Sequence, residues 1–129
     1  MRKLVRDNLV EMMQKLGEQV EWRTLEDTEF LREAGRKVTE ETTEFDPAKP
    51  DAKELVDIIE IAETVARAAR DAAAKAGISP EELEALQLQW REERGGFAKR
   101  TYVESIAMAD DDKWAAYYAS DPSRFTEIK

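Results

Sequence analysis

The sequence predicts an all-α protein that forms a single domain over residues 1–129. Apolar residues recur at helical spacing in four stretches, and glycine or proline stands near the ends of those stretches. The alternation typical of a strand is confined to Val20, Trp22 and Thr24, a segment too short and isolated to form a sheet. We therefore expect a helical bundle of four main helices, followed by a short C-terminal helix.

The first two helices are bounded by recognisable signals. The first is expected over residues 3–16, with Gly17 ending it. The residues of its buried face follow one another at intervals of four, three and four: Val5, Leu9, Met12 and Leu16. The second is expected to begin at Asp27 or Thr28, either of which can cap it, and to end before Pro47. Its expected buried face comprises Phe30, Leu31, Ala34, Val38 and Phe45.

The third helix is expected from an Asp51 cap to about Ala76, with Gly77 ending it. Because it is apolar on nearly every side between Leu55 and Ala69, a four-helix monomer covers only part of it. We therefore expect a homodimer or a higher homo-oligomer to complete the fold.

The fourth helix begins with a capping box that has proline at the first helical position, Ser79-Pro80-Glu81-Glu82, and runs to about Arg94. The pattern of residues 97–106 fits either an extended or a helical segment. A last short helix, carrying Trp114, Tyr117 and Tyr118, is expected after Asp110. We treat residues 104–129 as a C-terminal extension of the domain.

Composition excludes several classes of function. The net charge of −9 argues against nonspecific binding to nucleic acid and against an anionic membrane surface. The absence of cysteine and histidine removes thiol nucleophiles, the Ser-His-Asp triad and the usual zinc sites. No apolar run approaches 18 residues, and the N-terminus lacks the apolar core of a signal peptide. The expected location is cytoplasmic.

Two pairs of acidic residues flank the predicted break between the second and third helices. Glu41 and Glu44 stand three apart, as do Glu54 and Asp57, so each pair lies on one helix face. If the helices fold back on each other, the four carboxylates converge and suit a hard cation such as Mg²⁺. The alternative is an ordinary solvated helix face. The metal interpretation is favoured because Glu41 falls on an apolar stripe, where an unpaired carboxylate is costly.

Two basic clusters stand out in this acidic chain. One comprises Arg2, Lys3 and Arg6, and the other surrounds the Gly95-Gly96 turn with Arg91, Arg94, Lys99 and Arg100. Consecutive glycines let a backbone approach a phosphate, and the flanking cations neutralise it. A plain helix stop with surface charges is an equal alternative.

Three motifs resemble the all-α NTP pyrophosphatase superfamily, the MazG-like proteins. They are Glu40-Glu41-x-x-Glu44 followed by Glu54-x-x-Asp57, Lys3-Leu4-Val5-Arg6-Asp7, and Glu92-Glu93-Arg94-Gly95-Gly96-Phe97. The last two are similar to the compact branch described as phosphoribosyl-ATP pyrophosphohydrolase-like or house-cleaning NTP pyrophosphatase. The resemblance covers roughly residues 3–103. The opening motif departs from that branch at Asn8-Leu9-Val10, where a lysine followed by Ile-Pro is usual.

The resemblance implies a Mg²⁺-dependent enzyme, with Mn²⁺ as a possible substitute, that cleaves a nucleoside triphosphate between the α and β phosphates. It implies Glu41, Glu44, Glu54 and Asp57 as metal ligands, and Glu40 and Glu41 as the catalytic carboxylates, with Glu40 orienting water. The candidates for binding the substrate phosphates are Lys3, Arg6, Arg94, Lys99 and Arg100. Two alternatives stay open: phosphoribosyl-ATP hydrolysis in histidine biosynthesis, and a catalytically idle helical binding module.

Overall fold

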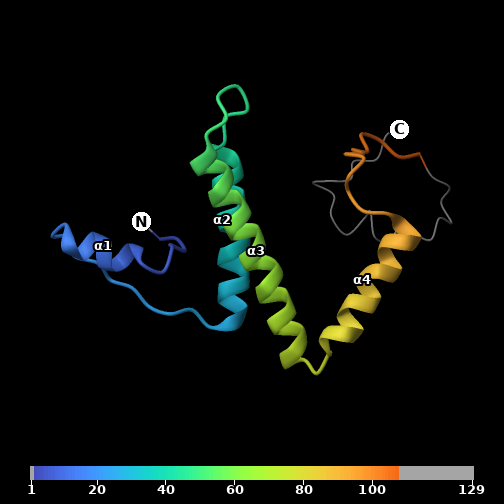
Figure 1. Cartoon of the computed structure of the whole chain (residues 1–129), viewed down its shortest axis with the longest axis horizontal. Coiled ribbons are helices and arrows are strands. Elements are labelled where there is room, and N and C mark those ends of the chain that lie inside the picture. The colour runs from blue at the N-terminus through green and yellow to red at the C-terminus, as the bar shows by residue number, and fades with distance from the viewer. Residues whose placement is uncertain (1, 108–129) are drawn as a thin grey trace. The chain divides into compact units, whose positions relative to one another are not determined.

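The computed structural model describes residues 2–107, and this part of the chain contains four helices and no strand (Figure 1). The helices are α1 (Leu9–Lys15), α2 (Asp27–Glu44), α3 (Ala52–Lys75) and α4 (Pro80–Arg94). The prediction of an all-α protein with four main helices is therefore confirmed. The short helix expected to carry Trp114, Tyr117 and Tyr118 lies outside the described residues.

Helices α2 and α3 form a hairpin and lie side by side along their length (Figure 1). The chain leaves α2 at Phe45, whose backbone is extended, and turns through a segment containing Pro47 and Pro50. Asp51 then caps α3, because its side chain accepts a hydrogen bond of 2.9 Å from the backbone N–H of Lys53. The predicted break and the predicted cap are both confirmed.

The hairpin contains the most enclosed part of the described chain. Ala34 of α2 is 0% exposed and Ile61 of α3 is 8% exposed, and they are the two buried apolar residues among residues 2–107. Helix α1 does not pack on the hairpin as α2 and α3 pack on each other. Within residues 2–89, the expected bundle therefore takes the form of a two-helix hairpin with a small core.

The start of α1 and the cap of α2 differ from the prediction, whereas α2 begins at Asp27 as expected. Helix α1 starts at Leu9, not at residue 3, and residues 3–8 form no helix. In this segment Lys3 and Arg6 contact carboxylates of the hairpin. The N-cap of α2 is Glu26, without a side-chain cap. Asp27 is instead the first helical residue, and its negative charge interacts favourably with the positive end of the helix dipole. Its carboxylate also pairs with Lys75.

The fourth helix follows its predicted signals. Ser79 Oγ accepts a hydrogen bond of 3.1 Å from the backbone N–H of Glu82, and Pro80 is the first helical residue. Gly95 follows Arg94 with a φ of 79°, a conformation that glycine adopts without strain. The open question about residues 97–106 is resolved: they form neither a helix nor a strand.

The chain divides into two compact units, residues 1–89 and 90–129. The hairpin and the N-terminal segment belong to the first unit, and the Gly95-Gly96 turn belongs to the second. Among the described helices, none has the length and the apolar content needed to cross a membrane.

Candidate metal centre

Three carboxylates gather on one face of α2. Glu40, Glu41 and Glu44 each offer an oxygen, and these oxygens lie within 4.8 Å of one another. Their positions along the helix explain this, because Glu40 and Glu44 are four residues apart and Glu41 and Glu44 are three apart. Glu40 is half-buried, Glu41 is buried and Glu44 is exposed, so the group runs from the enclosed side of the helix to the solvent.

The donor set fits a hard divalent cation. Carboxylate oxygens are ligands that Mg²⁺ accepts, and two oxygens bound to one Mg²⁺ lie at most about 4.2 Å apart. The three oxygens, which lie within 4.8 Å of one another, are close to that limit. In addition, Glu44 is exposed and leaves the group open to solvent.

Glu41 is the buried acid of the group, with 8% of its surface exposed. It lies on the apolar stripe that the sequence indicates, after Ala34 and Val38 and before Phe45. Burial of an ionised carboxylate is costly unless a counter-charge accompanies it. Lys37 supplies that charge, with its Nζ 3.1 Å from Glu41 Oε1.

Glu40 is held by two lysines. Lys3 Nζ donates to Glu40 Oε1 at 2.8 Å, and Lys37 Nζ lies 3.2 Å from Glu40 Oε2. The hydrogen bond from Lys3, followed by the weaker effect of Lys37, lowers the pKa of the Glu40 carboxyl, although burial opposes the shift. Glu40 is thus held as an anion, which suits it to orient water or to bind a cation.

The acids of α3 have a different setting. Asp57 is half-buried and accepts a hydrogen bond of 2.6 Å from Arg6 Nη2. Glu54, one turn earlier in α3, is also half-buried. The structure thus brings Glu41 and Glu44 together with Glu40, and it does not place Glu54 and Asp57 in that group of three oxygens.

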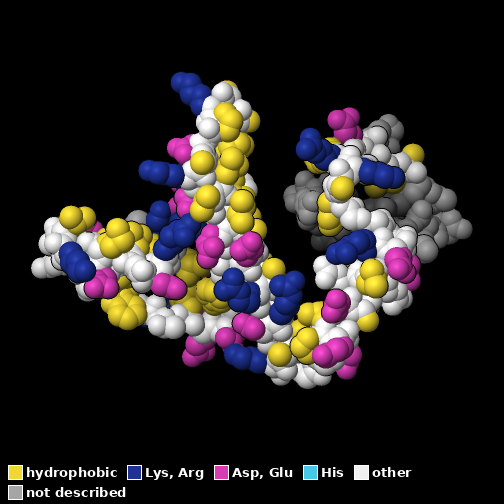
Figure 2. Space-filling model, in the orientation of Figure 1, with side chains coloured by type: hydrophobic (Ala, Val, Ile, Leu, Met, Phe, Trp, Pro, Cys, Tyr) yellow, Lys and Arg dark blue, Asp and Glu magenta, His cyan; other side chains and the backbone are white. Residues whose placement is uncertain are grey.

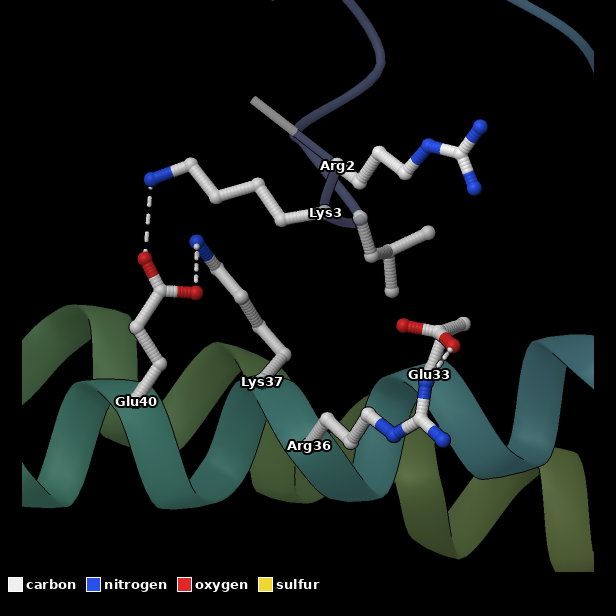
Figure 3. Close-up of a pocket in the computed structure, with 7 residues that line it drawn as sticks. Arg2, Lys3, Glu33, Arg36, Lys37 and Glu40 are labelled. Atoms are coloured by element: carbon white, nitrogen blue, oxygen red, sulfur yellow. Dashed lines mark hydrogen bonds and ion pairs between the residues drawn. The ribbon is translucent and has the colours of Figure 1, made fainter.

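The N-terminal segment and α2 enclose a hollow of about 160 Å³ beside Glu40 (Figure 3). Its charged lining comprises four basic and two acidic residues: Arg2, Lys3, Arg36, Lys37, Glu33 and Glu40. Figure 3 shows Lys3 and Lys37 both directed at Glu40, and Arg36 paired with Glu33. The hollow therefore adjoins the acidic group and has a positive balance of charge.

Two of the five predicted substrate-binding residues, Lys3 and Arg6, lie at carboxylates of the hairpin. The other three, Arg94, Lys99 and Arg100, belong to the second unit. There the Arg94 guanidinium lies 4.3 Å from the centre of the Trp90 ring, a cation–π contact. Phe97 is 97% exposed beside the glycine turn.

Sequence reasoning missed Lys37. This lysine contacts both Glu40 and Glu41, yet it belongs to neither of the two basic clusters of the sequence. A signal was present, because Lys37 stands three and four residues before two adjacent acids and must share their helix face.

Comparisons with known protein families, with curated proteins and with solved structures find no match to this chain.

Proposed function

We propose that this protein is a Mg²⁺-dependent nucleotide pyrophosphohydrolase that cleaves nucleoside triphosphates between the α and β phosphates. The observation that carries the proposal is the group of three carboxylate oxygens within 4.8 Å on α2. Two further features support it. Basic side chains of the N-terminal segment lie at the hairpin acids, and the motifs that contain these residues resemble those of MazG-like enzymes in content and order.

Each residue has a role that its setting permits. Glu40, Glu41 and Glu44 would hold Mg²⁺. Glu54 and Asp57 of α3 would join them if Arg6 released Asp57. When bound, Mg²⁺ neutralises phosphate charge and acidifies a coordinated water. Glu40, an anion with a lowered pKa, orients the attacking water. Lys3 and Arg6 bind phosphate oxygens, which are as good acceptors as the carboxylates that these residues now hold.

Attack of water on the α phosphorus breaks the bond from that atom to the bridging oxygen. We therefore expect a nucleoside triphosphate to give the monophosphate and pyrophosphate, with no diphosphate. The measurement is chromatography of the products after incubation with a nucleotide panel and Mg²⁺, with a chelator as control. Primary formation of diphosphate and orthophosphate contradicts the proposal. Hydrolysis of phosphoribosyl-ATP alone favours the biosynthetic alternative, and inactivity on every substrate favours the binding module.

The assembly proposed with this function is a homodimer. Leu55, Val56 and Ile59 of α3 are 40%, 55% and 56% exposed, and Figure 2 shows apolar side chains uncovered along the hairpin. Three large apolar residues within two turns of one helix form a surface that a second copy can cover. None of the large side chains among residues 2–107 is fully buried, so the first unit gains much from such cover.

We expect sedimentation equilibrium at micromolar concentration to give twice the chain mass of 14.8 kDa. Val56→Glu places a charge on the exposed α3 surface and should shift the protein towards monomer. Leu88→Glu is the control, because Leu88 is 51% exposed but lies on α4. A wild-type protein that sediments as a monomer contradicts the dimer.

A further inference from the structure

The ammonium group of Lys37 lies among the clustered carboxylates of α2, as a bound cation would. Its Nζ lies 3.2 Å from Glu40 Oε2 and 3.1 Å from Glu41 Oε1, so the ammonium bridges two of the three clustered carboxylates. Its side chain is 17% exposed, and Figure 3 shows it directed at Glu40 from the same helix. The lysine is thus a fixed positive charge within the acidic group.

An ordinary helix-stabilising pair does not account for this arrangement. On a helix, a glutamate that precedes a lysine by four residues stabilises more than the reverse order, and Lys37 precedes both of its acids. The pair of Glu11 and Lys15 in α1 has the favourable order and differs in setting. Its atoms are 3.3 Å apart, and its side chains are 70% and 74% exposed. The Lys37 side chain is largely enclosed, whereas the Lys15 side chain is largely exposed.

We propose that Lys37 is a tethered counter-cation that occupies the acidic group of α2 until a divalent metal ion displaces its ammonium. The inference rests on the metal site of the proposed function and adds a regulation of that site. The Lys37 ammonium and a divalent ion would compete for the same oxygens of Glu40 and Glu41, because each cation is attracted to the negative charge on those atoms. Metal binding therefore requires the lysine side chain to swing out, and Lys37 sets the metal concentration at which the site fills.

The consequence for affinity follows from the charge. An opposite charge within 4–6 Å changes the proton affinity of a carboxylate by about one to three powers of ten. A nearby ammonium lowers the affinity of a carboxylate for a metal ion as it lowers its affinity for a proton, so removal of the ammonium should raise the metal affinity. We expect Lys37→Gln, which keeps a hydrogen-bond donor, to bind Mn²⁺ about ten times more tightly than the wild type.

The experiment is a titration of the full chain with Mn²⁺ alone, without nucleotide, in which the paramagnetic resonance signal reports the free ion. Lys37→Arg keeps the charge and should retain the wild-type affinity. Arg36→Gln is the matched control: it removes one charge from the adjacent position of α2, where Arg36 pairs with Glu33 and is 69% exposed. Its affinity should change by less than about threefold, as expected for an exposed charge in high dielectric. Circular dichroism establishes that each variant is folded.

The outcomes separate the two proposals. If Lys37→Gln binds Mn²⁺ no more tightly than Arg36→Gln, the counter-cation inference is overturned, whatever the activity. The same holds if Lys37→Arg behaves like Lys37→Gln, since the charge is then irrelevant. Absence of Mn²⁺ binding in all variants overturns both the metal site and this inference. A protein that binds Mn²⁺ with the expected pattern but hydrolyses no nucleotide supports the inference and contradicts the proposed enzymatic function.

Discussion

Glu41→Gln is expected to abolish the response of the protein to Mg²⁺ and to reduce nucleotide hydrolysis by a factor of about 100 or more. Loss of a residue that only supports a metal ligand already costs 10- to 100-fold, and Glu41 is proposed as a ligand itself. In the wild type, Mg²⁺ at ten times its Kd adds about 1.4 kcal/mol to the free energy of unfolding. That gain raises the melting temperature by about 2–6 °C, and the variant should lack it.

Without metal, Glu41→Gln should melt no lower than the wild type. The substitution removes one of three crowded negative charges, and Lys37 keeps its contact with Glu40 at 3.2 Å. The measurement is a pair of melting curves for each protein, with Mg²⁺ and with chelator. Glu33→Gln is the control, because Glu33 is an acid of α2 that pairs with Arg36 and lies outside the acidic group. A variant that melts well below wild type in chelator, yet keeps the full Mg²⁺ shift, shows that Glu41 is merely a structural partner of Lys37.

Ile61→Ala is expected to lower the free energy of unfolding by about 2–4 kcal/mol, the usual cost of truncating a buried isoleucine. Ile61 is 8% exposed and is the large apolar residue buried in the hairpin, where its counterpart in burial on α2 is the small Ala34. With so few buried apolar side chains among residues 2–107, little else compensates for the loss. The melting temperature should fall by roughly 10 °C.

Urea unfolding followed by circular dichroism measures this effect. Leu16→Ala removes a comparable side chain from a position that is 80% exposed, and it should change the free energy of unfolding by less than about 0.5 kcal/mol. If the two variants lose equal stability, the packing of α2 on α3 is not what holds the first unit together.

The sequence was most informative where the signals were local. Proline in the break after Phe45, the Asp51 cap and the Ser79 capping box each act within a few residues, and each predicted boundary is found. The burial of Glu41 was also predictable, because a helix of 3.6 residues per turn fixes which side chains share a face. Local signals thus predicted the break between α2 and α3 and the helix face on which Glu41 lies.

The failures lie where tertiary contacts decide. The apolar spacing of residues 3–16 favours a helix throughout, but Lys3 and Arg6 are engaged with Glu40 and Asp57, at positions far along the chain. No helical period encodes such pairings. Lys37 was not singled out from the sequence, because a single lysine on an acidic helix is common and its two partners are known only from the structure. Glu40 was expected to orient water, and its place beside Glu41 and Glu44 on α2 adds it to the candidate metal ligands.

The ion pairs of the N-terminal segment have a consequence for the order of folding. A helical hairpin closes a short loop, whereas the contacts of Lys3 with Glu40 and of Arg6 with Asp57 span 37 and 51 residues. The entropy of loop closure grows with the logarithm of that span, and contacts distant in sequence form late. The two acids lie on different helices, Glu40 on α2 and Asp57 on α3, so the segment makes both contacts at once when the hairpin has formed. The segment that is synthesised before the hairpin is therefore expected to dock after it, and the acids of α2 come together before they contact Lys3 and Arg6.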